Sequence, residues 1–397
     1  MSKDEFDDAR TSSSADRRRS DVAVVAEQVG EFGGSERVLA AILSRYPRAT
    51  LVAERFSGGN VPDGFALPWA NPTRLFGPGG RRHHFLMPLY ARRYAVQRPE
   101  AAAVVVALVH YGWGLAASGS NGARWVAYSA GLPRAFYGYT NHYLDDYPAP
   151  LRAVLRTALP AIRLEYRRLM GRADRILANS LASARALSAV HHRPVEVLYP
   201  PVKTHFFTPA PRRREHYLVT ARMTSFKRVE VVIDAFRRLG SPLVIAGAGR
   251  LLTRLGHSLP SNVRLTGFVS DEELRELYRC SRALICPSVE EFGLVMAEAL
   301  ATGTPVMAPR AGGAMEIVDD GETGILLDEV TPEALSQAVP ALEGVSFDGE
   351  ACRGTAERFG EERFLTDLDR ILTEELAHAQ RAGMPIRGAD DTKLIRA

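Results

Sequence analysis

Short, continuous apolar runs recur along the chain and are separated by segments with helical periodicity. Runs of this kind indicate strands buried on both faces, as in a parallel sheet covered by helices. In the first half we expect such strands at Val22–Ala26, Ala49–Ala53, Ala102–Val109, Trp125–Tyr128, Arg175–Ala178 and Val195–Leu198. The long arginine-rich segment Leu151–Met170 is expected to form a helix. This alternation predicts an α/β domain with a doubly wound sheet.

The same pattern restarts after a proline-rich stretch, Tyr199–Pro211. There we expect strands at residues 217–220, 243–246, 263–265, 283–285, 305–308 and 325–327. Helices are expected between them, at residues 229–239, 271–280, 294–302 and 332–341. The chain therefore predicts two Rossmann-like domains that face each other across a substrate cleft.

Changes in composition set the predicted domain boundaries. Residues 1–20 are first acidic, then rich in serine and arginine, and lack an apolar signal core, so we expect them to be disordered. The N-terminal domain is predicted at residues 21–205 and the C-terminal domain at residues 206–355. A helix at residues 356–382 is expected to cross back onto the first domain, and the tail at 383–397 carries no fold signal.

The overall composition narrows the class of protein. Hydrophobic residues make up 46% of the chain and charged residues 24%, as in a soluble globular protein. No apolar run approaches the roughly 20 residues that span a bilayer. The three cysteines are odd in number and lack metal-site partners, which predicts buried thiols in a reducing cytoplasm. Zinc-ligand spacing, an aromatic RNA-binding motif and a dense basic stripe are all absent, which argues against nucleic acid.

Arginine is concentrated between Arg74 and Arg98, where six arginines mingle with aromatic and aliphatic residues. Such a mixture is typical of a surface that contacts an anionic membrane or receives an anionic acceptor. It is also typical of a solvated helix face over core residues. The sequence leaves these interpretations open.

The stretch from Cys286 to Gly303 carries the strongest chemical signal. A buried strand ends there, and Gly293 opens a helix, so that Glu290 and Glu298 flank a strand–loop–helix junction. At such a junction, backbone amides and the helix dipole can hold an anion while carboxylates accept hydrogen bonds from sugar hydroxyls. The alternative is that both glutamates are ordinary surface charges of a helix.

Two further loops follow predicted strands. Arg222 and Lys227 lie after the first strand of the second half, where an arginine fork and a lysine charge suit phosphate oxygens. Together with the Glu290–Glu298 segment they predict a diphosphate site. Gly33 and Gly34 lie between the first strand and a helix, where a bare backbone lets a substrate approach.

Other nucleotide motifs are not met. Gly247 and Gly249 follow a strand, but Leu252 stands where the third glycine of a dinucleotide fingerprint belongs. A Walker glycine–lysine loop is also lacking. Asp367 and Asp369 form a literal Asp-x-Asp, but they lie in a helical region, so metal-dependent diphosphate binding has little support.

Taken together, these residues resemble a known family. Glu290 and Glu298, with the intervening loop, are similar to the E-x7-E signature of retaining glycosyltransferase family 4. Arg222 and Lys227 are similar to its donor-diphosphate pair. Further similarities occur at Gly312, Gly313 and Glu316; at Asp320, Gly321, Thr323 and Gly324; at Gly33, Gly34, Glu36 and Arg37; at Ala178–Ser180; and at Tyr199–Val202. The resemblance extends from about Val22 to Ala379.

The resemblance implies the GT-B fold and transfer of a sugar from a nucleotide sugar, with retained anomeric configuration and without a metal or other cofactor. In that case Glu298 hydrogen-bonds the donor ribose, and Glu290 contacts the donor sugar. Arg222 and Lys227 neutralise the departing diphosphate. The expected donor site is completed by the backbone of Phe292, Gly293 and Leu294 and by Gly247 and Gly249.

The acceptor side is expected in the N-terminal domain. The segment Tyr128–Arg134 resembles the Y-x-H-x-P-x-R motif of the family's mannosyltransferases, although Ala130 replaces the central histidine. His110, in a loop after a strand, is a candidate for contacting the sugar or the reacting oxygens. Trp113 is a candidate for stacking on a sugar face, with core packing as the alternative. Arg134 and the Gly33–Gly34 loop complete the expected acceptor or phosphate side.

The sequence therefore predicts a retaining hexosyltransferase of the cytoplasm, positioned there or at the inner face of the membrane. The expected donor is a GDP- or UDP-linked sugar, with mannose favoured by the Tyr128–Arg134 similarity. The acceptor is expected to be a glycan, a lipid-linked saccharide or a small molecule. Two alternatives stay open: a sugar-nucleotide epimerase or hydrolase of the same fold, and a degenerate nucleotide-binding partner of an active transferase.

Overall fold

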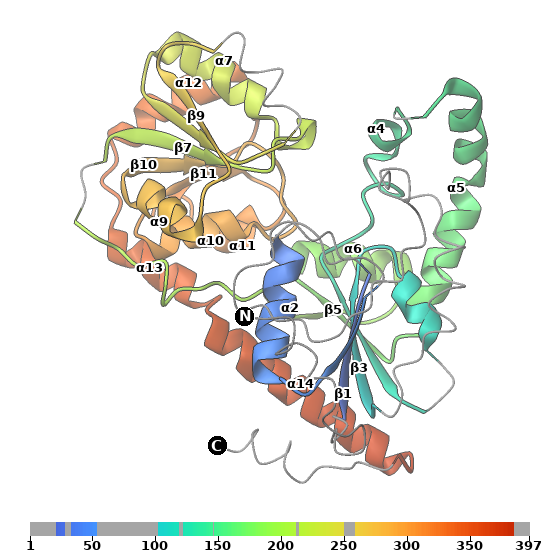
Figure 1. Ribbon diagram of the computed structural model, residues 1–397. Helices are drawn as coiled ribbons and strands as arrows, with labels where there is room; N and C mark the ends of the chain where they lie inside the picture. Colours follow the sequence, from blue (N-terminus) through green and yellow to red (C-terminus); the bar gives the residue numbers. More distant parts are fainter. Residues whose placement is uncertain are drawn as a thin grey trace, which may run out of the picture.

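The computed structural model describes residues 21–27, 33–53, 102–118, 122–145, 147–211, 214–249 and 259–384. The predicted N-terminal tail and the Arg74–Arg98 segment lie outside these residues, as does most of the predicted C-terminal tail. Figure 1 shows two domains, with the C-terminal helix running from the second domain along the first.

The N-terminal domain is built on one six-stranded sheet with the order β2-β1-β3-β4-β5-β6. Every neighbouring pair is parallel. The strands are β1 (Val22–Ala26), β2 (Thr50–Ala53), β3 (Val104–Val109), β4 (Arg124–Ser129), β5 (Arg175–Ala178) and β6 (Glu196–Val197). The helices are α2 (Gly34–Arg45), η1 (Trp113–Ala117), α4 (Thr140–Leu144), α5 (Ala149–Met170) and α6 (Leu181–His191).

The C-terminal domain repeats this plan, with the order β12-β11-β10-β7-β8-β9 and parallel pairs throughout. Its strands are β7 (His216–Thr220), β8 (Leu243–Ala246), β9 (Val263–Gly267), β10 (Ser281–Ile285), β11 (Val306–Pro309) and β12 (Gly324–Leu327). Its helices are η2 (Ser225–Lys227), α7 (Val229–Leu239), α9 (Asp271–Arg279), α10 (Leu294–Ala301), α11 (Ala314–Ile317), α12 (Pro332–Glu343) and α13 (Gly349–Glu357).

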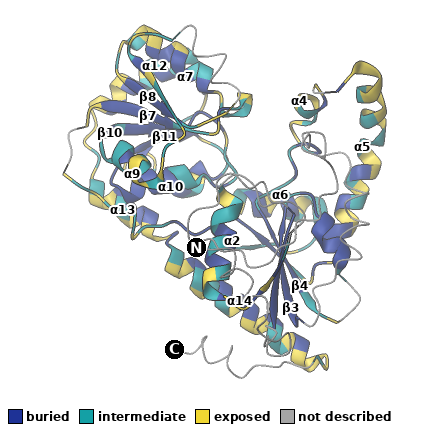
Figure 2. Ribbon diagram, viewed as in Figure 1, coloured by how far each residue is buried: buried dark blue, intermediate teal, exposed yellow. Residues whose placement is uncertain are grey.

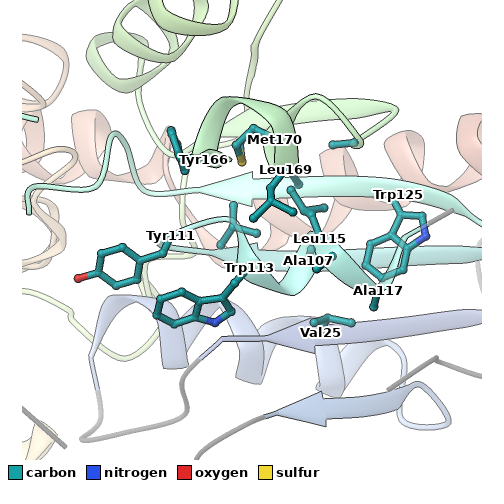
Figure 3. Close-up of a cluster of buried hydrophobic side chains, with 14 of the residues drawn as sticks. Val25, Ala107, Tyr111, Trp113, Leu115, Ala117, Trp125, Tyr166, Leu169 and Met170 are labelled. Atoms are coloured by element: carbon teal, nitrogen blue, oxygen red, sulfur yellow. The ribbon is translucent and has the colours of Figure 1, made fainter. Parts of the chain in front are cut away.

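The central strands are buried on both faces, as their uninterrupted apolar sequences predict. All residues of β1 and β3 are buried, and Figure 2 shows the sheet interiors in dark blue. Each sheet separates two apolar layers. One layer of the N-terminal domain is filled by aromatic residues of the β3–η1 segment and α5, as Figure 3 shows. Both faces of each sheet are thus covered, and the loops at its edge are left to carry polar groups.

The last helix, α14 (Glu361–Arg381), returns to the N-terminal domain. Its residues Phe364, Leu368 and Ile371 are buried in the same apolar cluster as β1, β3 and α2. The sequence predicted one helix from residue 356, and this boundary was wrong. Residues 349–357 form α13 on the C-terminal domain, and Gly360 then bridges Val202 in extended backbone before α14 begins. With this adjustment, the predicted architecture of two doubly wound domains and a crossing helix is confirmed.

Candidate active site

The loop between β10 and α10 brings Glu290 to Lys227. The Lys227 ammonium donates to both carboxylate oxygens of Glu290 at 2.6 Å. Ser288 Oγ donates to the same carboxylate at 2.5 Å. The side chain of Glu290 is therefore held in one orientation by a cation and a hydroxyl from two loops of the same sheet edge.

The shape of the Glu290 loop depends on the glycine pair Gly312–Gly313. The backbone N–H of Gly313 donates to the carbonyl of Glu290 at 2.9 Å. A Cβ atom on Gly313 would lie 1.9 Å from the carbonyl oxygen of Phe292, and Gly312 adopts a left-handed φ of +63°. The Glu290 loop and the Gly312–Gly313 pair, which lie in separate motifs of the sequence, are therefore packed against each other. Only glycine, which has no Cβ, lets the two backbone segments come this close.

Helix α10 begins at this loop with an uncapped end. Gly293 is its N-cap residue, with a φ of 104°, and no side chain accepts a hydrogen bond from the first turn at this position. The Phe292 side chain is buried against Tyr199 and Phe359, so only its backbone can serve a ligand. The N-terminus of α10 thus has the amide arrangement that suits a phosphate.

Arg222 lies at the exit of β7, on the segment that leads to Lys227. Its side chain is exposed and makes no hydrogen bond or ion pair to the described part of the chain. The neighbouring β8 exit packs closely on this segment: a Cβ on Gly247 would lie 1.9 Å from the Ala221 carbonyl oxygen. A Cβ on Gly249 would lie 2.5 Å from the Met223 carbonyl oxygen. Both glycines therefore shape the loop that presents Arg222.

The Glu298 carboxylate does not face solvent, as a carboxylate that is open to a ligand would. Its side chain is buried, and Oε1 accepts a hydrogen bond from Arg37 of the N-terminal domain. Tyr278 Oη donates to Oε2 at 3.1 Å. Burial raises the pKa of the Glu298 carboxyl, and the Arg37 charge opposes this shift. The predicted ribose contact of Glu298 stays a prediction.

Two more carboxylates of the C-terminal domain are held by the N-terminal domain. Arg134 forms a bidentate pair with Glu291, with Nε–Oε1 at 2.6 Å and Nη2–Oε2 at 2.5 Å. Glu316 accepts hydrogen bonds from the backbone N–H groups of Leu181 and Ala182, at 2.8 and 3.0 Å, at the start of α6. Arg134 and Glu316, both singled out in the sequence, therefore each bind a residue of the opposite domain.

His110 lies beside the predicted glycine loop. Its Nε2 is 3.2 Å from the hydroxyl of Ser35, the residue after Gly34. A Cβ on Gly34 would lie 3.3 Å from the Leu294 side chain of the other domain. The structure thus gathers His110, the Gly33–Gly34 loop and the start of α10 in one place.

The sequence missed Glu27, which organises the His110 loop. Its carboxylate is 1% exposed and accepts hydrogen bonds from the backbone N–H groups of His110, Tyr111 and Gly114 at 2.8, 2.7 and 3.1 Å. Burial raises the pKa of Glu27 to about 7, while these backbone hydrogen bonds oppose the shift. The sequence signal that could have identified Glu27 is its position directly after a five-residue apolar strand.

Trp113 does not stack on a sugar, which corrects the candidate role given to it. Its side chain is 1% exposed and lies in the core beside Val25 and Leu115 (Figure 3). The ring stacks on Tyr111, with centroids 4.7 Å apart and planes inclined by 17°. The alternative interpretation, core packing, is what the structure shows.

The described part of the chain contains no cluster of three His, Cys, Asp or Glu side chains arranged to hold a metal ion. Among its helices, none combines the length and apolar character needed to cross a membrane.

Comparison with known proteins extends this picture. Residues 214–343 match the family described as glycosyl transferases group 1. The D-inositol 3-phosphate glycosyltransferase of Thermobispora bispora is 30% identical over 262 residues, which cover 56% of this chain and 61% of that protein. The D-rhamnosyltransferase WbpZ of Pseudomonas aeruginosa is 30% identical over 198 residues, which cover 44% and 52%. The chain therefore matches less than two thirds of either relative's length.

Solved structures match over most of the chain. HepE from Anabaena, solved with UDP and glucose, aligns with a TM-score of 0.64 and 17% identity over 89% of this chain and all of its own. Sucrose-phosphate synthase from Thermosynechococcus elongatus aligns with a TM-score of 0.68 and 17% identity, over 91% of this chain and all of its own. The fold is GT-B. The match to glycosyl transferases group 1 lies within the C-terminal domain.

Proposed function

We propose that the protein is a retaining glycosyltransferase that uses a nucleoside-diphosphate sugar as donor. The observation that carries this proposal is the cluster at the edge of the C-terminal sheet: the Lys227–Glu290 pair, the exposed Arg222 and the uncapped start of α10. These groups combine two cations and free helix-terminal amides with a carboxylate, which is the chemistry that a sugar diphosphate requires.

In the proposed reaction, the bond between the anomeric carbon and the diphosphate oxygen breaks, and a bond from the acceptor hydroxyl oxygen to that carbon forms. The acceptor proton leaves with the departing diphosphate, and retention requires attack from the face that the diphosphate occupies. Arg222 and Lys227 stabilise the charge that develops on the leaving group. Such groups act most strongly where they are already in position and water is excluded.

Glu290 contributes in two ways. Its carboxylate fixes the Lys227 ammonium at 2.6 Å before substrate arrives. Its oxygens can also accept hydrogen bonds from hydroxyls of the donor sugar, as the family resemblance implies. Because Lys227 and Arg222 already provide positive charge, we propose that no metal ion is needed at the diphosphate.

The donor base and sugar are finer proposals. UDP and UDP-glucose are the ligands named for structures of HepE, and the named relatives include a rhamnosyltransferase. We therefore propose a UDP- or GDP-linked hexose, with mannose as the prediction from Tyr128–Arg134. The acceptor, a glycan, lipid-linked saccharide or small molecule, would approach from His110 and Arg134. A cytoplasmic location, with contact to the inner membrane face, also remains a proposal.

A thermal-shift panel of UDP, GDP and their glucose, mannose and rhamnose conjugates, with and without EDTA, tests the donor site. Binding to the folded state should raise the melting temperature with the logarithm of ligand concentration over the dissociation constant. A shift with one base, unchanged by EDTA, is the expected result. A shift that EDTA abolishes would contradict metal independence. If the melting temperature of the folded protein did not change with any of these nucleotides, the donor site would be contradicted.

Product analysis then tests the reaction. With the donor identified, the transferred sugar should keep its anomeric configuration in the product, which nuclear magnetic resonance can read. Consumption of the donor without any acceptor would instead favour an epimerase or hydrolase. Donor binding without turnover on any acceptor class would favour a partner of another transferase.

A further inference from the structure

Arg228 has an unusual backbone conformation directly after the candidate phosphate-binding lysine. Its φ is 49° and its ψ is 33°, in the left-handed region. Among the described residues other than glycine, His192 is the only other one with a positive φ. A residue with a Cβ atom is disfavoured in this region, so the conformation costs free energy that glycine would not lose. It persists only where the surrounding structure compensates for that cost.

The residue is the joint between two helical elements. Arg228 is the C-cap residue of η2 and the N-cap residue of α7. Its backbone N–H donates to the Ser225 carbonyl at 3.2 Å, and its carbonyl accepts a hydrogen bond from the Val231 N–H at 3.1 Å. Val229, the first residue of α7, is buried and fixes the helix side of the joint. The conformation of Arg228 therefore sets how the η2 turn, which ends in Lys227, stands relative to α7.

The Arg228 side chain ties this joint to another loop at the same edge of the sheet. Its Nη2 donates to the Val330 carbonyl oxygen at 2.7 Å. Val330 lies in the loop between β12 and α12, and its own side chain is buried. The next residue, Thr331, caps α12 by accepting a hydrogen bond from the Ala334 N–H at 3.1 Å. The Arg228 guanidinium is therefore anchored on backbone that the domain core and a helix cap already fix.

We propose that Arg228 is a positioning residue for Lys227. Its hydrogen bond to Val330 compensates for the left-handed backbone and holds the η2 turn in the place where the Lys227 ammonium meets Glu290 and the departing diphosphate. The proposal rests on the proposed function, since it takes stabilisation of the leaving group as the task of Lys227. Arg228 acts through Lys227, because its own Nη2 is engaged at Val330.

A glycine at this joint would not serve the same purpose. Glycine adopts the left-handed conformation more readily, but it also allows many others, so the η2 turn would be free to move. The side chain of Arg228 restricts the joint to one conformation. A cation stabilises developing charge best when it is already in position and needs no reorganisation during the reaction.

Three substitutions of Arg228 separate the side-chain tether from the backbone conformation. Arg228→Met should lower kcat about tenfold, the size expected for one lost hydrogen bond from a charged donor, with a smaller effect on nucleotide affinity. Arg228→Lys should retain more activity than Arg228→Met, because an ammonium can also donate to a carbonyl oxygen. Arg228→Gly should lose as much activity as Arg228→Met although it removes the backbone strain. Wild-type turnover in Arg228→Met or in Arg228→Gly would overturn the proposal.

A double-mutant cycle with Lys227→Ala distinguishes positioning from general weakening of the fold. If Arg228 acts through Lys227, Arg228→Met should not reduce the residual kcat of Lys227→Ala any further. A further loss of about tenfold in the double variant would overturn the proposal, because Arg228 would then act independently of Lys227.

Arg238→Met is the matched control for these variants. It breaks the Arg238–Glu333 ion pair, which is another arginine link between α7 and the beginning of α12. Its kcat should equal that of wild type. A loss of kcat as large as that of Arg228→Met would overturn the proposal, since any weakening of the contact between these helices would then explain the effect.

Hydrogen exchange without ligand gives a measurement that does not depend on the proposed function. The Lys227 N–H donates to the Thr224 carbonyl at 3.0 Å, within the η2 turn. In Arg228→Met this amide and that of Arg228 should exchange about tenfold faster than in wild type, while amides in the middle of α7 keep their rates. If no version of the protein binds or turns over any donor, the proposed function fails, and the hold of Arg228 on the turn is judged on exchange alone. Unchanged exchange in that case would overturn it.

Discussion

The ring of Phe226 lies 4.1 Å from the ring of His142, across the interface between the two domains. Tyr139 and Tyr143 contribute two further ring contacts, at 5.1 and 5.6 Å. Phe226 directly precedes Lys227, so the N-terminal domain holds the loop that presents the candidate phosphate-binding lysine. These contacts between the domains therefore help to position Lys227.

Phe226→Ala should lower kcat about tenfold with a smaller effect on the melting temperature. Each aromatic pair contributes about 0.5–1.5 kcal/mol beyond its buried area, and these contacts serve the interface rather than either core. Phe226→Tyr keeps the ring and should retain most of the activity. Steady-state kinetics and thermal unfolding of both variants test this. An unchanged kcat in Phe226→Ala would show that the aromatic contact is not needed to position Lys227.

Lys227→Ala should reduce kcat by about 10²–10³-fold, the range measured when one pre-positioned group that stabilises developing charge is removed. Nucleotide binding should persist, because Arg222 and the start of α10 remain. Arg238→Ala removes an exposed arginine that pairs with Glu333 on the surface of the same domain, and it should leave kcat unchanged. Retained turnover in Lys227→Ala, with nucleotide bound, would show that the leaving-group role is misassigned.

Gly313→Ala should disturb the Glu290 loop without unfolding the domain core. The new methyl group would overlap the carbonyl oxygen of Phe292, 1.9 Å away, so the loop must shift. We expect donor affinity to fall at least about tenfold, which calorimetry measures. Gly354→Ala, in α13, is the control: its Cβ meets nothing within 4 Å, and it should stabilise the protein by about 1 kcal/mol through helix propensity alone. Equal donor affinity in the two variants would refute the loop argument.

The periodic part of the fold could be predicted because burial leaves a local signature. Strands β5 and β8 and helix α7 occupy the predicted residues, since each is an unbroken apolar or amphipathic segment. Helix α6 was missed: it is short, rich in alanine and serine, and follows β5 after only two residues. The break between α13 and α14 was missed because it follows from the long-range bridge between Val202 and Gly360.

The candidate site could be predicted as a set of residues but not as a set of partners. Arg37 and Glu298 are 261 positions apart, and sequence alone places a cation and an anion without showing that they bury each other. Trp113 illustrates the reverse error, since a loop tryptophan has the same local pattern whether it faces a sugar or the core. Glu27 was overlooked because its partners are backbone N–H groups, which every sequence contains.

The pKa of Glu27 gives the last prediction, a pH dependence of stability. Burial raises this pKa from its ordinary value of 4.5 to about 7 in the folded protein. Between pH 4.5 and about 7, the Glu27 carboxyl keeps its proton in the folded state and has lost it in the unfolded state. The free energy of unfolding should therefore fall as the pH rises through this window, and the contribution of Glu27 should be lost above it.

Glu27→Gln isolates this contribution, because glutamine cannot titrate. Between pH 4.5 and 7, wild type should lose on the order of 3 kcal/mol relative to the variant. Urea unfolding at several pH values measures both slopes, and near-ultraviolet circular dichroism checks that the variant keeps its native packing. Parallel slopes would mean that the three backbone N–H groups hold Glu27 as a carboxylate throughout, with burial the weaker of the two opposing effects.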